Sequence, residues 1–201
     1  MSGVLRLCES EMTDGQDNER DPLQPDVDQT LVDQAIEELP YRTAAYERLM
    51  QKYQRMIFGV CYRMLNNRAD AEDICQDVMV KVFGTLQKFE GRSSFKTWLM
   101  KITSNTCLTH ITKNKRRREI RTEWAEDPAR DGTTMIDTSD HDVSALLSTI
   151  KPKEREVLTL RYLGDLSLQE IAEVCDISLS AAKMRLYRAT EALNAQVKKH
   201  D

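Results

Sequence analysis

The sequence predicts an all-α protein with two small helical domains, joined by a flexible acidic linker, the second domain containing a helix-turn-helix. Only seven Gly and five Pro occur in 201 residues, beside abundant Leu, Glu, Lys and Arg, which favours helices over strands and turns. Apolar residues recur at steps of three and four in several segments, as one face of a helix requires. The length fits two small domains better than one large core.

Charge is segregated along the chain although the formal net charge is only −4. Residues 1–40 have a net charge of −9, residues 41–118 of +10, residues 119–142 of −6 and residues 143–201 of +1. A strongly positive block between acidic segments indicates a domain that binds a polyanion. The apolar runs are too short to cross a bilayer, so we expect no membrane insertion.

The chemistry-bearing residues do not form an enzyme motif. The five cysteines are an odd number without a CxxC pair, and the chain begins without a cleavable apolar leader, so we expect a reducing, cytoplasmic location. Cys107 and His110 lie one helical turn apart, but two ligands do not make a zinc site. Without a Gly-rich phosphate loop, an HExxH motif or a nucleophile elbow, we expect no catalysis, no metal and no cofactor.

The first domain is predicted over residues 41–118, after an acidic and mostly disordered extension over residues 1–40 that ends in one short helix at 29–39. Its first helix carries an apolar face and ends at Asn66-Asn67; that face consists of Tyr46, Leu49, Tyr53, Ile57, Val60 and Met64. A second helix begins near Ala69, with acids in its first turn, and has the stripe Ile74, Val78, Val82 and Leu86. After a polar loop at 90–94, a third helix starts at Phe95 and becomes strongly basic towards residue 118.

The second domain is predicted over residues 143–201, after a linker at 119–142 that loses the periodicity and gains acids, Pro and Gly. A short helix at 143–150 precedes a helix from 154 to 163, for which Gly164 is the expected stop. Ser167 to Glu170 form a capping box that opens a helix of about two turns. A tight turn with Ile177 and a longer basic helix complete a helix-turn-helix. The alternative is a packed helical hairpin with a solvated charged face.

Two stretches in the first domain carry a family resemblance. The segment from Lys88 to Asn105 (KFEGRSSFKTWLMKITSN) resembles the promoter-reading segment of extracytoplasmic-function sigma factors, and Asp70 to Val78 (DAEDICQDV) resembles their polymerase-docking helix. With the helix-turn-helix, the resemblance covers about residues 41–194. It implies a bacterial initiation subunit without catalysis, which binds core RNA polymerase and directs initiation at promoters. The runner-up is a helix-turn-helix regulator that acts without being a polymerase subunit.

The resemblance also implies site residues in the first domain. Asp73, Gln76 and Asp77 match the contact with a coiled coil of the polymerase clamp. A loop beside aromatic rings receives the extruded minus-ten base, with Asn105 lining that pocket, and basic residues up to Arg118 bind phosphate. The expected minus-ten residues are Phe89, Gly91, Arg92, Ser93, Ser94, Phe95, Trp98, Lys101, Asn105, Lys113, Arg116 and Arg117. For Trp98, packing in the core and contact with DNA are equally open.

In the second domain, the resemblance places the minus-thirty-five contacts on the long helix, at Ser180, Lys183, Arg185 and Arg188. A bidentate arginine contact to guanine would supply about 1–3 kcal/mol of discrimination. The pair Ala181-Ala182 departs from the family's usual threonine and β-branched residue. The implied partners are core RNA polymerase, through its clamp coiled coil and its flap, promoter DNA, and the anti-sigma factor that members of this family usually have.

Overall fold

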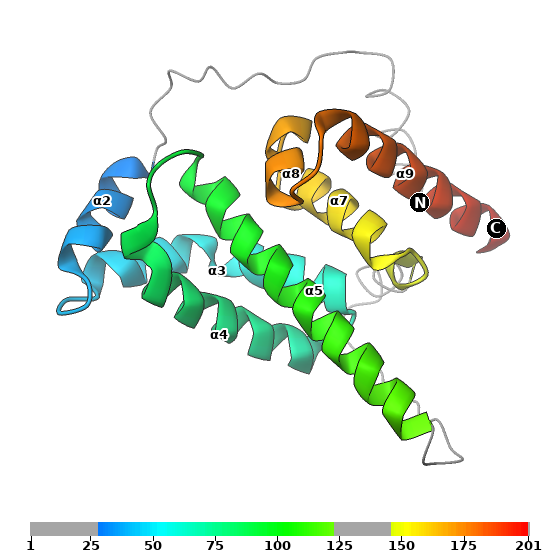
Figure 1. The fold of residues 1–201 in the computed structure, drawn as a ribbon, viewed down its shortest axis with the longest axis horizontal. Helices are drawn as coiled ribbons and strands as arrows, with labels where there is room; N and C mark the ends of the chain where they lie inside the picture. The colour runs from blue at the N-terminus through cyan, green and yellow to red at the C-terminus, as the bar shows by residue number, and fades with distance from the viewer. Residues whose placement is uncertain (1–27, 123–145, 201) are drawn as a thin grey trace.

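A computed structural model describes residues 28–122 and 146–200, with the side chains of residues 28–120 and 146–196 (Figure 1). The regular structure of these residues is helical, which confirms the all-α prediction. The expected disorder of residues 1–27 and the expected flexibility of most of the linker concern residues outside the described ranges. In the described part of the chain, no helix combines the length and the apolar character that crossing a membrane would need.

The N-terminal bundle, residues 28–122, contains four α-helices and a short 3-10 turn. Its helices are α2 (Gln29–Glu38), α3 (Ala44–Leu65), α4 (Arg68–Thr85) and α5 (Phe95–Thr122), with η1 at Leu86–Lys88. Asn66 ends α3 in a left-handed conformation with φ 53°, and the Asn67 side chain accepts a hydrogen bond from the Asp70 amide to cap α4. The helix expected at 29–39 is present as α2, and α5 continues four residues past the predicted end at 118.

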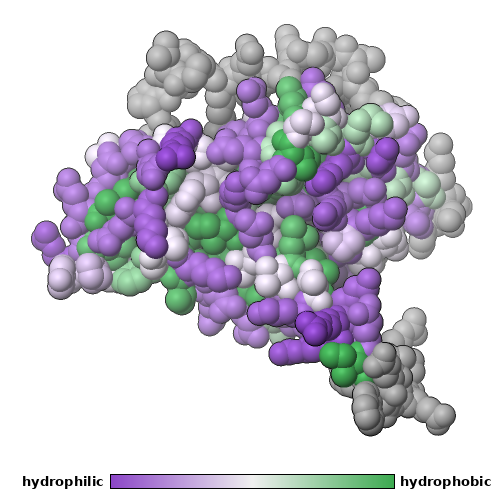
Figure 2. Space-filling view, viewed as in Figure 1, coloured by the Kyte–Doolittle hydropathy of each residue, from purple (hydrophilic) through white to green (hydrophobic). Residues whose placement is uncertain are grey.

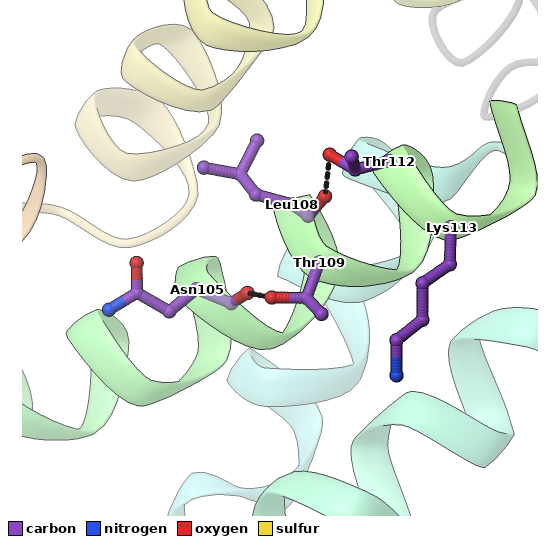
Figure 3. Close-up of a pocket in the computed structure, with 5 residues that line it drawn as sticks. All are labelled: Asn105, Leu108, Thr109, Thr112 and Lys113. Carbon is purple, nitrogen blue, oxygen red and sulfur yellow. Dashed lines mark hydrogen bonds between the residues drawn. The ribbon is translucent and has the colours of Figure 1, made fainter. Parts of the chain in front are cut away.

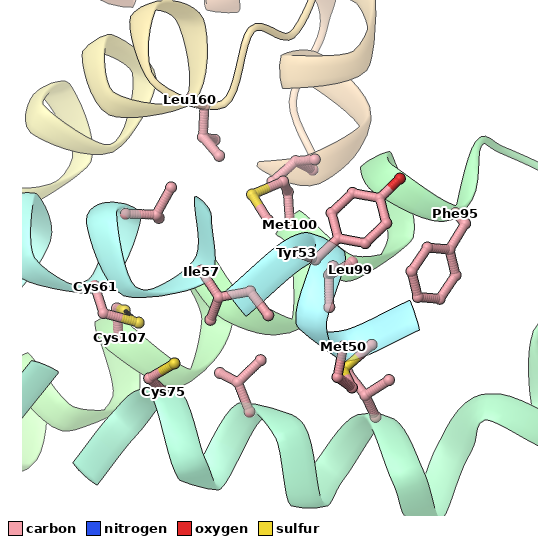
Figure 4. Packing of buried hydrophobic residues seen from close by; sticks show 14 of the residues in the cluster. Met50, Tyr53, Ile57, Cys61, Cys75, Phe95, Leu99, Met100, Cys107 and Leu160 are labelled. Carbon is pink, nitrogen blue, oxygen red and sulfur yellow. Dashed lines mark hydrogen bonds between the residues drawn. The ribbon is translucent and has the colours of Figure 1, made fainter. Parts of the chain in front are cut away.

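The core of the N-terminal bundle forms where α3, α4 and α5 meet (Figure 4). Ile57 of α3 and Leu99 of α5 have no exposed surface, and α2 adds Val32 and Ala35 to the same cluster. Asp28, at the start of α2, accepts hydrogen bonds from Lys52 and Tyr53 of α3. The helix that precedes residue 40 is therefore part of the packed bundle.

The C-terminal bundle, residues 146–200, contains α7 (Pro152–Tyr162), α8 (Leu168–Val174) and α9 (Leu179–His200). The capping box predicted at Ser167 and Glu170 is present, with the Ser167 amide 2.9 Å from Glu170 Oε2 and the Glu170 amide 3.2 Å from Ser167 Oγ. Ala172 and Ala182 are buried between α8 and α9, so small side chains permit the close crossing of the helix-turn-helix. Of the short helix expected at 143–150, the described part is one turn at 146–148.

Gly164 and Gly84 give opposite expectations for alanine substitution. A Cβ at Gly164 would lie 2.6 Å from the Leu160 carbonyl oxygen, so Gly164→Ala must displace backbone and should cost about 1–3 kcal/mol of unfolding free energy. A Cβ at Gly84, near the end of α4, meets nothing within 4 Å, so Gly84→Ala should add about 0.5–1 kcal/mol. Urea unfolding of both variants checks this, and equal shifts would contradict the helix-end assignment at Gly164.

Candidate nucleic-acid interface

One side of α5 forms a polar stripe while its opposite side fills the bundle core. We define the α5 stripe by side chains three and four positions apart, namely Lys101, Asn105, Leu108, Thr109, Thr112, Lys113 and Arg116. All of them are exposed or half-buried, whereas Leu99, Met100 and Cys107 on the other side have no exposed surface. Hydrophilic side chains also gather around the far end of α5 on the molecular surface (Figure 2).

An open groove of about 410 Å³ lies in the middle of the stripe, lined by Asn105, Leu108, Thr109, Thr112 and Lys113 (Figure 3). The Thr109 hydroxyl donates to the Asn105 carbonyl at 2.7 Å and the Thr112 hydroxyl donates to the Leu108 carbonyl at 2.8 Å. With these hydroxyl protons used, the Asn105 amide and the Lys113 ammonium are the side-chain groups of the groove that can still donate hydrogen bonds. An amide that both donates and accepts suits a nucleobase, and a cation about two helical turns farther along α5 suits a phosphate.

The loop before α5 rests on a cluster of aromatic rings. Phe89, Phe95 and Trp98 have their ring centroids 5.3–5.9 Å apart. Gly91 in the loop has φ 68°, and Ser94 Oγ accepts a hydrogen bond from the Thr97 amide at 3.1 Å, capping α5. This local geometry fixes the position of the loop relative to the stripe.

The expected loop residues occupy different environments. Phe89, Ser93, Ser94 and Trp98 are half-buried, and Arg92 is exposed and pairs with Glu90. Phe95 was expected to contact DNA, but its ring has no exposed surface. We therefore correct its role to packing beneath the loop, because a buried ring cannot contact a base. Trp98 both packs on this cluster and retains exposed surface.

The basic residues near the C-terminal end of α5 lie on different sides of the helix. Lys113, Arg116 and Arg117 are exposed, and Lys115 forms an exposed ion pair with Glu119 at 3.7 Å. Arg118 is two residues beyond Arg116, which places it about 200° around the helix axis from Arg116. Among these arginines, Arg116 therefore continues the α5 stripe, and Arg118 lies on the far side.

A second exposed surface lies on α4, and we call it the α4 face. Asp73, Gln76 and Asp77 are exposed there, as the docking prediction requires. Val80 lies three and four residues beyond Asp77 and Gln76 and is 72% exposed, and Phe83 is 37% exposed. An apolar centre within a polar rim is typical of protein interfaces. The sequence analysis did not identify Val80 as an exposed residue. The available signal is that this valine interrupts the polar side of an amphipathic helix.

The long helix α9 exposes three of the four expected residues, together with two that were not expected. Ser180, Lys183 and Arg188 are exposed, but Arg185 is half-buried at the side of the helix. Met184 and Tyr187 lie in the middle of the exposed side, at 51% and 47% exposure. Neither residue was predicted to be exposed, because an apolar residue in a helix is by default assigned to the side that packs in the core of the domain.

The surroundings of α9 account for two pKa shifts. Burial raises the pKa of Cys175 to about 12, and the Glu156 carboxylate adds to the rise while the Arg185 guanidinium opposes it. The Tyr187 hydroxyl donates to Glu191 Oε1 at 2.8 Å, which raises the pKa of that tyrosine. Arg185 thus faces the interior of the C-terminal bundle, and Tyr187 is held along the surface of α9.

No group of three metal-ligating side chains occurs within residues 28–122 and 146–200. Cys107 Sγ lies 3.6 Å from Cys61 Sγ, and both side chains are fully buried. This contact, followed by burial, raises the pKa of Cys61 far above its ordinary value. His110 instead lies 3.3 Å from an Asp70 carboxylate oxygen, so Cys107 and His110 have separate partners.

Comparisons with known proteins agree with the two bundles. The model of Sigma-70 region 2 matches residues 49–117, and that of Sigma-70 region 4 matches residues 140–193. The ECF RNA polymerase sigma factor SigW of Bacillus subtilis is 31% identical over 170 residues, which cover 77% of this chain and 89% of SigW. The ECF RNA polymerase sigma-E factor of Haemophilus influenzae is 29% identical, over 83% of this chain and 96% of that protein.

A solved structure shares the fold. The sigma factor RpoE from Bartonella quintana, in complex with the anti-sigma factor NepR, superposes with a TM-score of 0.64 at 22% identity. The superposition covers 76% of this chain and 96% of the RpoE chain.

Arg116 and Arg118 form a matched pair for testing the α5 stripe. Arg116→Ala should weaken binding of single-stranded DNA of any sequence and lower the slope of log affinity against log salt by about 0.7, because one phosphate contact is lost. Arg118→Ala removes the same charge from the far side of α5 and should change the slope less. Fluorescence anisotropy over a salt series measures both, and equal slopes would contradict the position of the stripe.

Proposed function

This chain belongs to the extracytoplasmic-function sigma factors of bacterial RNA polymerase, and from that membership we propose which of its surfaces bind the polymerase and which bind the promoter. It is a promoter-directing subunit of RNA polymerase, from a family of non-enzymatic initiation factors. We propose that it has no catalytic activity of its own. Because its partners are the transcription machinery and the chromosome, we also propose a cytoplasmic location.

One observation supports the assignment of surfaces: the N-terminal bundle has two exposed faces, one on α4 and one on α5. The α4 face and the α5 stripe lie on two different helices of the N-terminal bundle (Figure 1), and the side chains of both sets are exposed or half-buried. The carboxylates of Asp73 and Asp77 can accept hydrogen bonds from basic side chains, and Val80, one helical turn beyond Asp77, can bury apolar surface beside them. We assign the α4 face to the clamp coiled coil of the polymerase. A helix-turn-helix regulator acting alone would have no use for it.

We assign the α5 stripe and the preceding loop to the minus-ten element. The groove at Asn105 has the mixed polar and apolar lining that an unstacked base needs, and the flanking cations suit the phosphates on either side. The ring cluster beneath the loop supplies rigidity, because Phe95 holds the loop from the core. Capturing a base costs a few kcal/mol of unstacking, and a groove preformed on a helix reduces the further cost of ordering.

The exposed side of α9 is assigned to the minus-thirty-five element. Lys183 and Arg188 flank Met184 and Tyr187 there, which places cations around an apolar centre. In a major groove the cations suit phosphates and guanine, and the apolar residues suit thymine methyl groups. Arg185 is better placed to orient α9 than to contact a base, since it is half-buried beside Cys175.

We keep the remaining assignments as proposals. The domains run over residues 41–118 and 143–201, with α2 as an added helix of the first, and the second domain also contacts the polymerase flap. The fold similarity to RpoE in complex with NepR supports an anti-sigma factor as a further partner.

Loss of the α4 face should abolish function without abolishing DNA contact. With core polymerase, the wild-type chain should produce transcripts from specific start sites. The double variant Asp77→Ala with Val80→Ala should bind core polymerase at least tenfold more weakly, as is common when hot-spot residues of an interface are removed. The matched control is Glu47→Ala, which removes an exposed acid from α3. Analytical gel filtration and in vitro transcription measure the two effects. Unchanged holoenzyme formation in the double variant would overturn the docking assignment.

Met184 should make recognition sensitive to a thymine methyl group. In a promoter identified by transcription, thymines are replaced one at a time by deoxyuridine, which lacks the methyl group. At one position this replacement should weaken wild-type binding about fourfold, because burying one methyl group is worth roughly 0.8 kcal/mol. Met184→Ala should lose this preference and Met184→Leu should keep it. Holoenzyme binding to the substituted duplexes measures it, and a preference that survives in Met184→Ala would contradict the contact.

A further inference from the structure

Three helices of the N-terminal bundle each place one cysteine in its core. Cys61 is on α3, Cys75 on α4 and Cys107 on α5, and all three belong to the buried cluster where these helices meet (Figure 4). Cys61 and Cys107 have no exposed surface, and Cys75 is only 4% exposed. They do not form a metal site, because no set of three ligating side chains is close enough within the described ranges. The chemistry open to them is therefore a reaction between thiols.

The sulfur atoms of Cys61 and Cys107 are already in contact. The Cys107 thiol donates a hydrogen bond to Cys61 Sγ, with the two sulfurs 3.6 Å apart. Groups held about 3–3.5 Å apart are close to the distance at which a bond begins to form. A disulfide needs the sulfurs to approach to about 2.05 Å, which small changes of the two side-chain torsions supply. The two thiols are thus placed to react with each other once one of them is oxidised.

In the folded bundle the thiols are protected from oxidation. The thiolate is the form that peroxides oxidise. The contact with Cys107, followed by burial, holds the pKa of Cys61 far above its ordinary value, and burial, followed by Cys61, raises the pKa of Cys75 to about 11. Both groups are protonated at neutral pH and shielded from solvent. An oxidant therefore reaches them only when the bundle opens locally.

Oxidation of a single thiol in this core would be destructive. A sulfenic acid without a neighbouring thiol is oxidised further to sulfinic acid, which ordinary thiol reductants do not reverse. A sulfinate is charged, and burying an unpaired charge in the cluster that contains Ile57 and Leu99 is strongly unfavourable. A second thiol at contact distance prevents this outcome, because it converts the sulfenic acid into a disulfide.

We propose that Cys61 and Cys107 form a reversible oxidation site, which hydrogen peroxide converts into a disulfide between α3 and α5. In the first step, the sulfur of one cysteine attacks a peroxide oxygen, the O–O bond breaks, and a sulfenic acid and one water form. In the second step, the other thiol attacks the sulfenic sulfur, the S–S bond forms and a second water leaves. Two thiols and one peroxide thus give one disulfide and two waters. A dithiol reductant restores both thiols by exchange.

The disulfide forms on the side of α5 that faces away from the groove. Asn105 and Thr109 are each two residues from Cys107, which places them about 200° around the helix axis from it. The crosslink joins residues 46 positions apart in the chain, so it restricts the unfolded chain and stabilises the fold. We therefore expect the oxidised bundle to stay folded and to keep its DNA contacts, and the second expectation rests on the proposed function of the α5 stripe.

Mass spectrometry of the full chain after peroxide treatment tests the site. The background is Cys8→Ser, because Cys8 lies outside the described residues. The treated protein should lose two hydrogen atoms, yield one linked pair of peptides that contains Cys61 and Cys107, and regain its mass in dithiothreitol. Urea below the unfolding midpoint should accelerate the reaction at least threefold. A linkage through Cys75 or Cys175, or sulfinic acid at Cys107 without a linkage, would overturn the proposal.

Cys107→Ser and Cys175→Ser are matched variants, because each removes one thiol. Cys175 is half-buried in the C-terminal bundle, beside Glu156 and Arg185. Cys107→Ser should lower the yield of disulfide at least tenfold and leave sulfinic acid at Cys61, whereas Cys175→Ser should leave the yield unchanged. Cys107→Ala repeats the measurement without a buried hydroxyl, and urea unfolding before treatment checks that each variant is folded. An undiminished yield in the Cys107 variants would refute the pairing.

The stability and the DNA binding of the oxidised protein test its effect on the bundle. The midpoint of urea unfolding should rise by about 1–2 M on oxidation. Affinity for a minus-ten single strand should stay within about threefold of that of the reduced protein. A lower midpoint, or a loss of affinity of tenfold or more, would contradict a protective disulfide. If the reduced chain does not bind the strand, the proposed function fails, while the peptide linkage and the midpoint still decide the oxidation site.

Discussion

The packing of α5 is the constraint on which the other surfaces depend, because a single helix fills the bundle core and presents a polar stripe. Leu99 and Met100 have no exposed surface and belong to the buried core cluster, which fixes the rotation of the helix about its axis. Once that rotation is set, Asn105 and Arg116 must point outward. The stripe is rigid since a shift of one residue would turn apolar side chains into water and polar ones into the core, at a cost of several kcal/mol.

Threonine hydroxyls make this division of α5 possible. Thr103, Thr106, Thr109 and Thr112 each donate to the carbonyl four residues back, so they are satisfied inside the core and on the stripe alike. A buried threonine with its hydroxyl occupied packs almost as an apolar residue. On the exposed side the same pairing uses the hydroxyl protons and leaves the hydroxyl oxygens as acceptors only. In the function that we propose, the Asn105 amide supplies selectivity in the groove, and Lys113 and Arg116 supply the attraction for phosphates.

Local patterns in the sequence predict the helices well and the surfaces less well. The periodicity of α3, the cap at Ser167 and the stop at Gly164 all depend on residues within one or two turns, so their signals are local. The exposure of Val80 and Met184 has only a weak signal in the sequence, because it depends on which side of each helix the neighbouring helices leave uncovered. The pairing of Lys96 with Asp165 joins residues 69 positions apart, and nothing in either local sequence indicates the other.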